Sequence, residues 1–149
     1  MFKKLFLVAA AVLIAAAPSP SLAQGKKDSV VMAMALEPPG LDPTTAAAAA
    51  IAEVTLYNVY ETLTKINEDG SVSPLLAESW QASPDLKTYT FKLRKGVKFQ
   101  NGEPFNSAAV KFSFERNAQP ASTNKDKSLF QSFVSVTAPD ADTVVIALN

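Results

Sequence analysis

Hydrophobic and polar residues alternate most clearly over residues 88–94. Tyr89, Phe91 and Leu93 occupy every second position, with threonine, lysine and arginine between them. Successive side chains of a β-strand point to opposite faces, so this pattern predicts a strand with one buried and one solvated face. The basic residues on and around this strand are interpreted as the solvated face of a sheet rather than as a binding patch. They are Lys87, Lys92, Arg94, Lys95 and Lys98.

Other apolar stretches bounded by turn residues also predict strands. The longest, residues 29–36, is rich in valine, methionine and alanine and is expected to be a buried strand. The two prolines that follow Glu37 end it, because proline cannot donate a hydrogen bond to a sheet. Shorter strands are expected at residues 64–67, 72–74, 134–138 and 143–148.

A helix is predicted in the first half of the chain. Thr44 or Thr45 can cap it, and the alanine run 46–50 favours helix formation. Apolar positions at spacings of three and four form one stripe of this helix: Leu56, Val59, Tyr60 and Leu63.

A second helix is predicted over residues 106–118. Asn106 can cap it, and Phe105 and Val110 stand at the two positions of a hydrophobic staple. The apolar residues of this segment also alternate, which leaves a strand open, but the cap, the staple and the length favour a helix. Shorter helical pieces are expected at residues 75–80 and 129–133.

The N-terminus has the order of a secretory signal peptide. Lys3 and Lys4 precede an unbroken apolar run, residues 5–17, and small residues stand at Ser21 and Ala23. A membrane anchor is the alternative, but a span needs roughly 20 apolar residues and this run is shorter. We therefore expect cleavage after Ala23 and export to the periplasm. Since the chain has no cysteine, no thiol can carry a lipid, and a free protein rather than a lipoprotein is expected.

Composition narrows the chemistry. The sequence contains neither histidine nor cysteine, so Ser–His and Cys–His nucleophiles are impossible and the usual metal ligands are missing. No cofactor is expected. Acidic and basic residues balance, which gives no reason to expect a nucleic-acid partner. A small secreted hydrolase that uses a pair of carboxylates remains open, although no spacing of the acids suggests one.

An ordered set of short motifs gives the sequence a family resemblance. The motifs are Leu41-Asp42-Pro43, Tyr60-Glu61-Thr62-Leu63, Pro74-Leu75-Leu76-Ala77-Glu78-Ser79-Trp80, the alternating strand with Gly96-Val97-Lys98-Phe99 and Asn101-Gly102, and Phe112-Ser113-Phe114-Glu115-Arg116. The set resembles the family 5 solute-binding proteins of ABC importers, which include dipeptide, oligopeptide and nickel binders. The resemblance runs from about Val30 to Leu148.

The resemblance implies an α/β fold of the periplasmic binding protein-like type II class, in which two lobes enclose a ligand. It implies that this chain forms only part of one lobe, a mixed sheet with flanking helices. After the signal peptide, residues 1–23, residues 24–45 would form the first strand and turn of the N-terminal lobe, and residues 46–149 an inserted subdomain of that lobe, truncated.

The implied function is binding without chemistry. The protein would capture a ligand, by default a peptide, in the periplasm and deliver it to permease subunits of an ABC importer in the inner membrane, as a monomer. Two alternatives stay open: a truncated remnant or small periplasmic interaction domain that binds no ligand, and the carboxylate hydrolase.

The resemblance places the segment after the first strand near the ligand cleft. The candidate ligand-binding residues are therefore Glu37, Pro39, Gly40 and Leu41, where two prolines and a glycine give a rigid backbone that cannot join a sheet. The alternative is that this segment is only the turn that ends a strand. Aromatic residues that could stack on a ligand, Trp80, Tyr57 and Tyr60, are interpreted as core residues.

Overall fold

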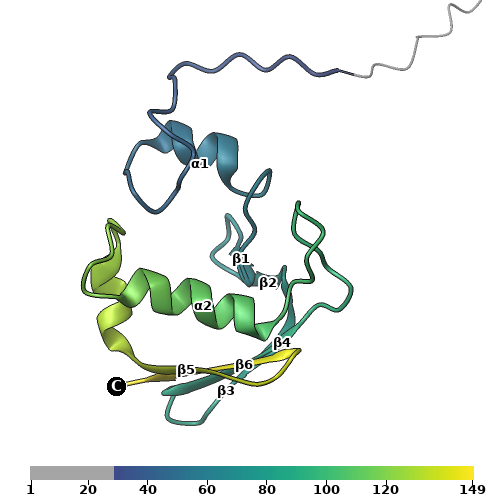
Figure 1. The fold of residues 1–149 in the computed structure, drawn as a ribbon, viewed down its shortest axis with the longest axis vertical. Helices are drawn as coiled ribbons and strands as arrows, with labels where there is room; N and C mark the ends of the chain where they lie inside the picture. Colours follow the sequence, from purple (N-terminus) through teal and green to yellow (C-terminus); the bar gives the residue numbers. More distant parts are fainter. Residues whose placement is uncertain (1–28) are drawn as a thin grey trace, which may run out of the picture. The chain divides into compact units, whose positions relative to one another are not determined.

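The computed structural model describes residues 29–149 of the chain (Figure 1). The expected signal peptide and its cleavage position lie outside the described residues. The chain divides into two units, Met1–Ala33 and Met34–Asn149, and the elements below all belong to the second. Within residues 29–149, none of the helices has both the length and the apolar character needed to cross a membrane.

A four-stranded antiparallel sheet is the largest element of the fold. Its strands lie in the order β3-β4-β6-β5, and their bounds are β3 Ala77–Ala82, β4 Thr88–Leu93, β5 Phe133–Asp140 and β6 Thr143–Leu148. In this register Phe91 stands opposite Val144 on one side and opposite Trp80 on the other. Because directly opposed residues point to the same face, the alternation along β4 gathers apolar side chains on one side of the sheet.

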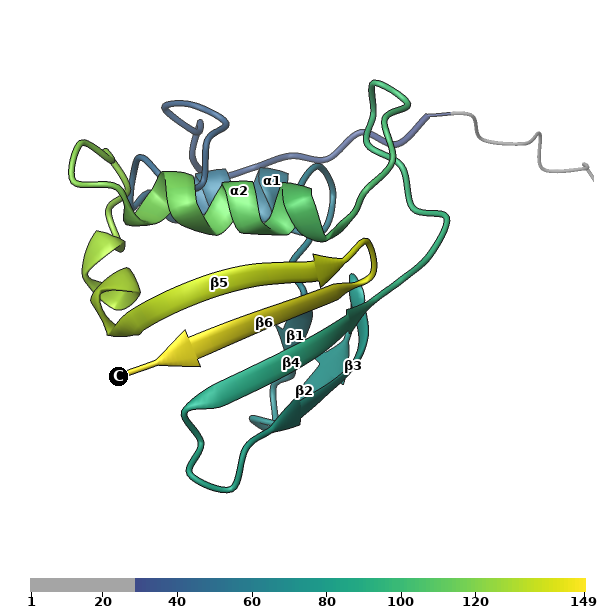
Figure 2. The ribbon, with the colours of Figure 1, turned by 60° about the horizontal axis from the view of Figure 1, so that its bottom comes forward.

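Helix α2, Ser107–Ala118, lies across that apolar face over β5 and β6 (Figure 2). The Asn106 side chain accepts a hydrogen bond from the backbone N–H of Ala109 at 3.0 Å and so caps the helix, as predicted. The helix and the sheet share the main core. Its buried members are Ala77, Leu93, Val110, Val136, Val144 and Ile146.

The other elements of the fold are smaller than α2 and the four-stranded sheet. Strands β1, Thr64–Ile66, and β2, Val72–Pro74, form a two-stranded antiparallel sheet. Between them Gly70, with φ of +80°, supplies the left-handed residue of the turn. The remaining elements are the seven-residue helix α1, Ala49–Thr55, and the 3₁₀ segment η1, Lys127–Ser132.

The strand expected at residues 29–36 is not formed. The segment pairs with no described strand, and it is exposed; Val31 is 95% exposed. Strand-forming residues do not stabilise a single extended segment unless a neighbouring strand forms hydrogen bonds with its backbone.

The first helix is shorter than expected and begins later. Neither Thr44 nor Thr45 caps it; its N-cap is Ala48, which makes no side-chain hydrogen bond. It ends at Thr55, because Tyr57 adopts φ of +64° and the side chain of Asn58 donates to the backbone carbonyl of Val54 at 3.2 Å. The apolar stripe predicted to continue to Leu63 therefore belongs to a loop.

Residues 75–80, expected to be helical, form most of β3 instead. Their pairing with β4 overrides the helix preference of alanine and glutamate, and a bulge between Ala77 and Ser79 accommodates the extra residue. The resemblance also implied a mixed sheet, whereas the strand pairs of the described residues are antiparallel.

Candidate functional site

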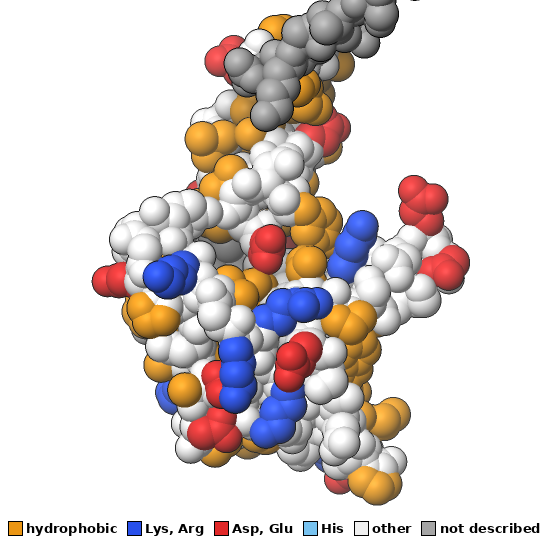
Figure 3. Space-filling view, turned by 90° about the vertical axis from the view of Figure 1, so that its right-hand side faces the viewer, with side chains coloured by type: hydrophobic (Ala, Val, Ile, Leu, Met, Phe, Trp, Pro, Cys, Tyr) orange, Lys and Arg blue, Asp and Glu red, His pale blue; other side chains and the backbone are white. Residues whose placement is uncertain are grey.

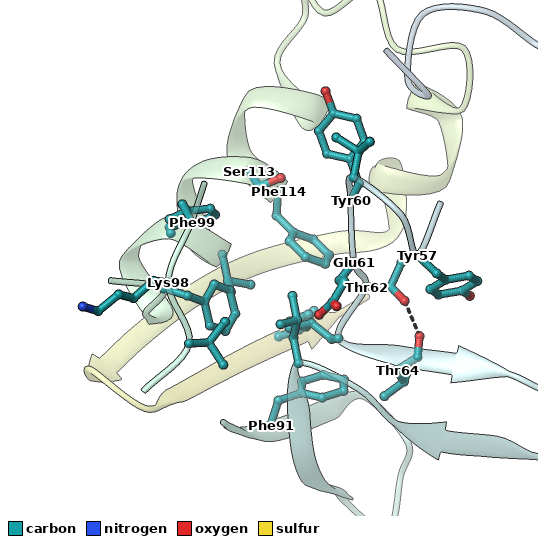
Figure 4. Close-up of a pocket in the computed structure, with 18 of the residues that line it drawn as sticks. Tyr57, Tyr60, Glu61, Thr62, Thr64, Phe91, Lys98, Phe99, Ser113 and Phe114 are labelled. Carbon is teal, nitrogen blue, oxygen red and sulfur yellow. Dashed lines mark hydrogen bonds between the residues drawn. The ribbon is translucent and has the colours of Figure 1, made fainter. Parts of the chain in front are cut away.

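A cavity lies between α2, the apolar face of the sheet and the loop formed by residues 57–64 (Figure 4). Its volume is about 850 Å³. Phe114 projects into it from α2, and Phe91 of β4 lies on the opposite wall (Figure 4). Further apolar lining side chains are Val59, Leu63, Leu76, Val97, Phe99, Phe105, Val110, Phe133, Ile146 and Leu148. Polar side chains, among them Glu61, Lys98 and Gln100, also line the cavity.

The loop at the mouth of the cavity is held by one contact with a distant part of the chain and by two local contacts. Gln100 donates a side-chain hydrogen bond to the backbone carbonyl of Val59 at 3.0 Å. Lys65 places its ammonium 5.5 Å from the centre of the Tyr57 ring, within the range of a cation–π interaction. The Thr62 hydroxyl donates to the carbonyl of Thr64 at 2.6 Å (Figure 4). The loop at the mouth is therefore ordered by specific contacts.

The cavity has the surface of a packing site rather than of a reactive centre. In residues 29–149, no buried side-chain nitrogen or oxygen lacks a hydrogen-bond partner, and polar side chains of the wall such as Glu61 and Lys98 are exposed to solvent. The same residues contain no group of three or more histidine, cysteine, aspartate or glutamate side chains that could hold a metal. The apolar part of the wall can bury apolar groups, and its exposed polar side chains can make hydrogen bonds or ion pairs.

The candidate ligand-binding residues lie elsewhere. Glu37, Pro39, Gly40 and Leu41 are exposed and line neither this cavity nor the smaller one near Asp42. The structure places them next to each other on an irregular segment, but brings no opposing wall to them. Their role in ligand binding stays a prediction.

The turn after these residues is fixed by Asp42. Its carboxylate accepts hydrogen bonds from the hydroxyl of Thr44 at 2.7 Å and from the backbone N–H of the same residue at 2.8 Å. These bonds hold the pKa of Asp42 below its ordinary value. The backbone carbonyl of Thr44 also accepts from the N–H of Lys125 at 2.8 Å, which ties the turn to the segment after α2.

Two of the three aromatic residues interpreted as core do not fit that interpretation. Tyr57 and Tyr60 are 47% and 46% exposed, because they lie in the loop at the mouth of the cavity and not on a buried helix. Trp80 is half-buried on β3. The cavity was not predicted from the sequence. The many aromatic residues between positions 89 and 114 were the pattern that could have indicated an aromatic cavity.

The basic residues around β4 are paired or solvated, as predicted. Lys95 lies 3.1 Å from a carboxylate oxygen of Asp142, which raises the pKa of that lysine, and Lys92 donates to the hydroxyl of Thr143 at 2.8 Å. Figure 3 shows a face on which basic and acidic side chains lie side by side. Such interspersed charges produce no field of one sign that would attract a polyanion.

A model of the bacterial extracellular solute-binding proteins, family 5 Middle, matches residues 71–149, more than half of the chain. The chain belongs to this family. The resemblance seen in the ordered motifs is thereby confirmed. The family is one of solute-binding proteins, which agrees with the prediction of a binding protein rather than an enzyme.

The relatives of this solute-binding protein chain extend well beyond it. It is 37% identical to the glutathione-binding protein GsiB of Escherichia coli K12 over 136 residues, which cover 91% of this chain and 26% of the relative. The chain thus spans about a quarter of the length of the curated relatives it matches.

Two solved structures confirm the fold. OppA of Haemophilus influenzae, in complex with the peptide RPPGFSPFR, aligns with a TM-score of 0.68 at 28% identity, over 76% of this chain and 25% of OppA. NikZ of Campylobacter jejuni, in complex with Ni(L-His), aligns with a TM-score of 0.66 at 30% identity, over 76% of this chain and 22% of NikZ. The α/β periplasmic binding protein fold, of which the chain forms a part, is confirmed.

Proposed function

We propose that this chain is part of the substrate-binding component of an ABC importer and that its ligand is a small peptide. The supporting observation is the similarity to the glutathione-binding protein over 91% of the chain, since glutathione is itself a tripeptide. The alignment with a peptide-bound OppA points the same way.

A peptide is favoured over a metal complex by the chemistry of the chain. The sequence supplies no histidine or cysteine, so this chain lacks the imidazole and thiolate ligands that suit divalent transition metals such as nickel and zinc. Peptides require backbone-like hydrogen bonds and apolar contacts instead, which irregular exposed backbone can provide.

The ligand contacts that this chain contributes are proposed to come from Glu37, Pro39, Gly40 and Leu41. The two prolines keep the backbone out of any sheet, so its N–H and C=O groups are free to meet an extended ligand. The exposed carboxylate of Glu37 is suited to the positively charged N-terminus of a peptide.

The cellular setting belongs to the same proposal. The signal peptide would be removed after Ala23, and the protein would act as a free monomer in the periplasm and deliver its ligand to permease subunits in the inner membrane. Residues 24–45 would belong to the N-terminal lobe and residues 46–149 to a subdomain inserted into it.

Calorimetry on the protein made from its own gene, with its native downstream sequence, tests this proposal. We expect glutathione or a tetrapeptide to bind with a Kd near or below about 1 μM, roughly 8 kcal/mol of binding free energy, and Ni(L-His) to bind more weakly. Leu41→Ala should weaken binding, whereas Leu129→Ala, at a similarly exposed leucine, should not. A product of the relatives' length that binds no peptide contradicts the proposal.

A further inference from the structure

The turn at Asp42 is the place where the exposed segment before it first meets the rest of the chain. Residues 39–41 are exposed, whereas Asp42, Pro43 and Thr44 are half-buried. Among the described residues, no hydrogen bond involves residues 37–41, and the first ones along the chain are those of the Asp42 turn. Whatever fixes this turn therefore sets where the segment 37–41 stands.

The Asp42 turn differs in its setting from the other aspartate turns of the described residues. Asp69, Asp85 and Asp140 also accept a hydrogen bond from the backbone N–H two positions further on, and each stands between two paired strands. The turn at Asp42 joins no strands, and it does not begin α1, whose N-cap is Ala48. Neither a hairpin nor a helix start accounts for it.

A contiguous set of hydrogen bonds connects this turn to α2 instead. The backbone carbonyl of Thr44 accepts from the N–H of Lys125 at 2.8 Å, although the two residues are far apart in the sequence. The neighbouring Asn124 side chain donates to the side-chain oxygen of Asn117, in the last turn of α2, at 3.1 Å, and accepts from the N–H of Asp126 at 2.9 Å. Because α2 packs on the sheet, the turn is joined to the main core.

One carboxylate oxygen of Asp42 determines the backbone at Thr44. It accepts both the N–H and the hydroxyl of Thr44, and so fixes the conformation in which the Thr44 carbonyl meets Lys125. Arg116 lines the same small cavity as Asp42, but no ion pair joins the two among the described residues. The oxygen acceptor, rather than the charge, is therefore the property of Asp42 that the turn needs.

We propose that Asp42 is a positioning residue, which anchors the segment 37–41 to the C-terminal end of α2 through the bond between Thr44 and Lys125. The proposal rests on the function proposed above, which takes this segment as the place of ligand contact. Asp42 acts through the backbone and need not touch the ligand. A contact segment that is held in place before binding loses less entropy when the ligand arrives, so the anchor strengthens binding.

Nitrogen-15 NMR relaxation of Gly40 and Leu41 in the 149-residue chain tests the anchor without any ligand. We expect backbone order parameters near 0.8 in the wild type and below about 0.6 in Asp42→Ala. Asp42→Asn should keep the wild-type values, because an asparagine side chain makes the same turn. The matched control is Asp69→Ala, which removes the same pair of bonds, to the N–H and hydroxyl of Ser71, from the turn between β1 and β2. It should leave Gly40 and Leu41 unchanged.

Three results overturn the proposal: low order parameters at Gly40 and Leu41 in the wild type, wild-type values in Asp42→Ala, and an equal loss of order in Asp42→Asn. Thr44→Val removes the hydroxyl bond alone and should lower the order parameters part of the way. It gives the same reading if Asp42→Ala does not fold.

Calorimetry on the gene product with its native downstream sequence measures the consequence for binding. With glutathione or a tetrapeptide as the probe, Asp42→Ala should raise the Kd about tenfold, and Asp42→Asn and Asp69→Ala should stay within about twofold of the wild type. An unchanged Kd in Asp42→Ala overturns the positioning role. A wild-type product that binds neither probe contradicts the function proposed above, and the order parameters then decide the anchor by themselves.

Discussion

Among the described residues, two non-glycine residues have a left-handed backbone, Tyr57 and Leu86. Their settings differ. Tyr57 lies at the mouth of the cavity and contacts Lys65, whereas Leu86 stands at the end of the turn before β4, where its N–H donates to the carbonyl of Ser83 at 2.9 Å. Strain at Tyr57 accompanies a structured site, and strain at Leu86 is a by-product of a tight turn.

Leu86→Asn should stabilise the protein. Leu86 is 63% exposed, so little packing is lost, and asparagine tolerates the left-handed region that leucine disfavours. We expect the free energy of unfolding in urea to rise by about 0.5–1 kcal/mol. Leu129→Asn is the control, since Leu129 is 68% exposed and has no positive φ. An equal change in both variants would show that backbone strain is not the cause.

Asp140 makes part of the stability of the fold dependent on pH. Its carboxylate accepts hydrogen bonds from the Thr143 hydroxyl at 2.8 Å and from the backbone N–H of Asp142 at 2.9 Å. The bond from Thr143, followed by that from Asp142, holds the pKa of Asp140 below its ordinary value. A carboxyl group with a lowered pKa in the folded state stabilises it above the pKa of the unfolded chain. That contribution is lost as the pH falls through the folded-state pKa.

The free energy of unfolding should therefore decrease as the pH falls below about 4, and Asp140→Asn should decrease less steeply over the same window. Thermal unfolding followed by circular dichroism between pH 2 and pH 7 measures this. Glu68→Gln is the matched control, because no hydrogen bond to the Glu68 carboxylate is found among the described residues. If Asp140→Asn keeps the wild-type slope, the two hydrogen bonds do not control the acid response.

At the scale of elements, the sequence predicted those that are defined by local patterns. The alternation of Tyr89, Phe91 and Leu93 is a property of one strand, and β4 forms within one residue of the expected bounds. The same holds for β1, β2, β6 and α2, whose caps, turns and apolar positions lie close together in the sequence.

The elements that sequence reasoning missed depend on distant partners. Residues 77–80 of the expected helical piece belong to β3 because β4 lies beside them, and residues 29–36 stay unpaired because no described strand accepts them. The first helix ends early because Asn58 and the backbone of Tyr57 compete with it. The cavity was not predictable for the same reason, since its walls come from segments as far apart in the sequence as Tyr57 and Leu148. The candidate binding residues were nominated from resemblance, and the fold only shows that they are exposed.

Helix α2 depends on its cap. The backbone N–H of Ala109 has its partner in the Asn106 side chain, and a helix leaves its first N–H groups without internal partners. Asn106→Ala should lower the free energy of unfolding by about 1 kcal/mol. Asn106→Asp keeps an oxygen acceptor at the same position and should stay within about 0.5 kcal/mol of the wild type. Equal losses in the two variants, measured by urea unfolding, would mean that the cap does not determine the stability of α2.

At the scale of the whole molecule, α1 buries Ala50 and Ile51, but the main hydrophobic cluster of the described residues is the core described above. It holds α2 against the four-stranded sheet, while the candidate ligand-binding residues stand on an irregular segment outside that core. Ligand sites are concave and bury about 70–90% of a ligand's surface. Glu37, Gly40 and Leu41 supply one exposed surface and no opposing wall.

The 149-residue chain alone should therefore not bind peptide with micromolar affinity. A Kd of about 1 μM requires about 8 kcal/mol of net binding free energy, and a one-sided contact with exposed backbone leaves most of the ligand in water. Calorimetry with glutathione and with a tetrapeptide, at chain concentrations of about 100 μM, measures this; the E. coli glutathione-binding protein under the same conditions is the positive control for glutathione. Circular dichroism confirms that the chain is folded during the titration. Micromolar binding by the folded chain would show that one quarter of the family's length encloses a ligand. The exposed segment would then have to close on the ligand, and Leu41→Ala would abolish the heat of binding.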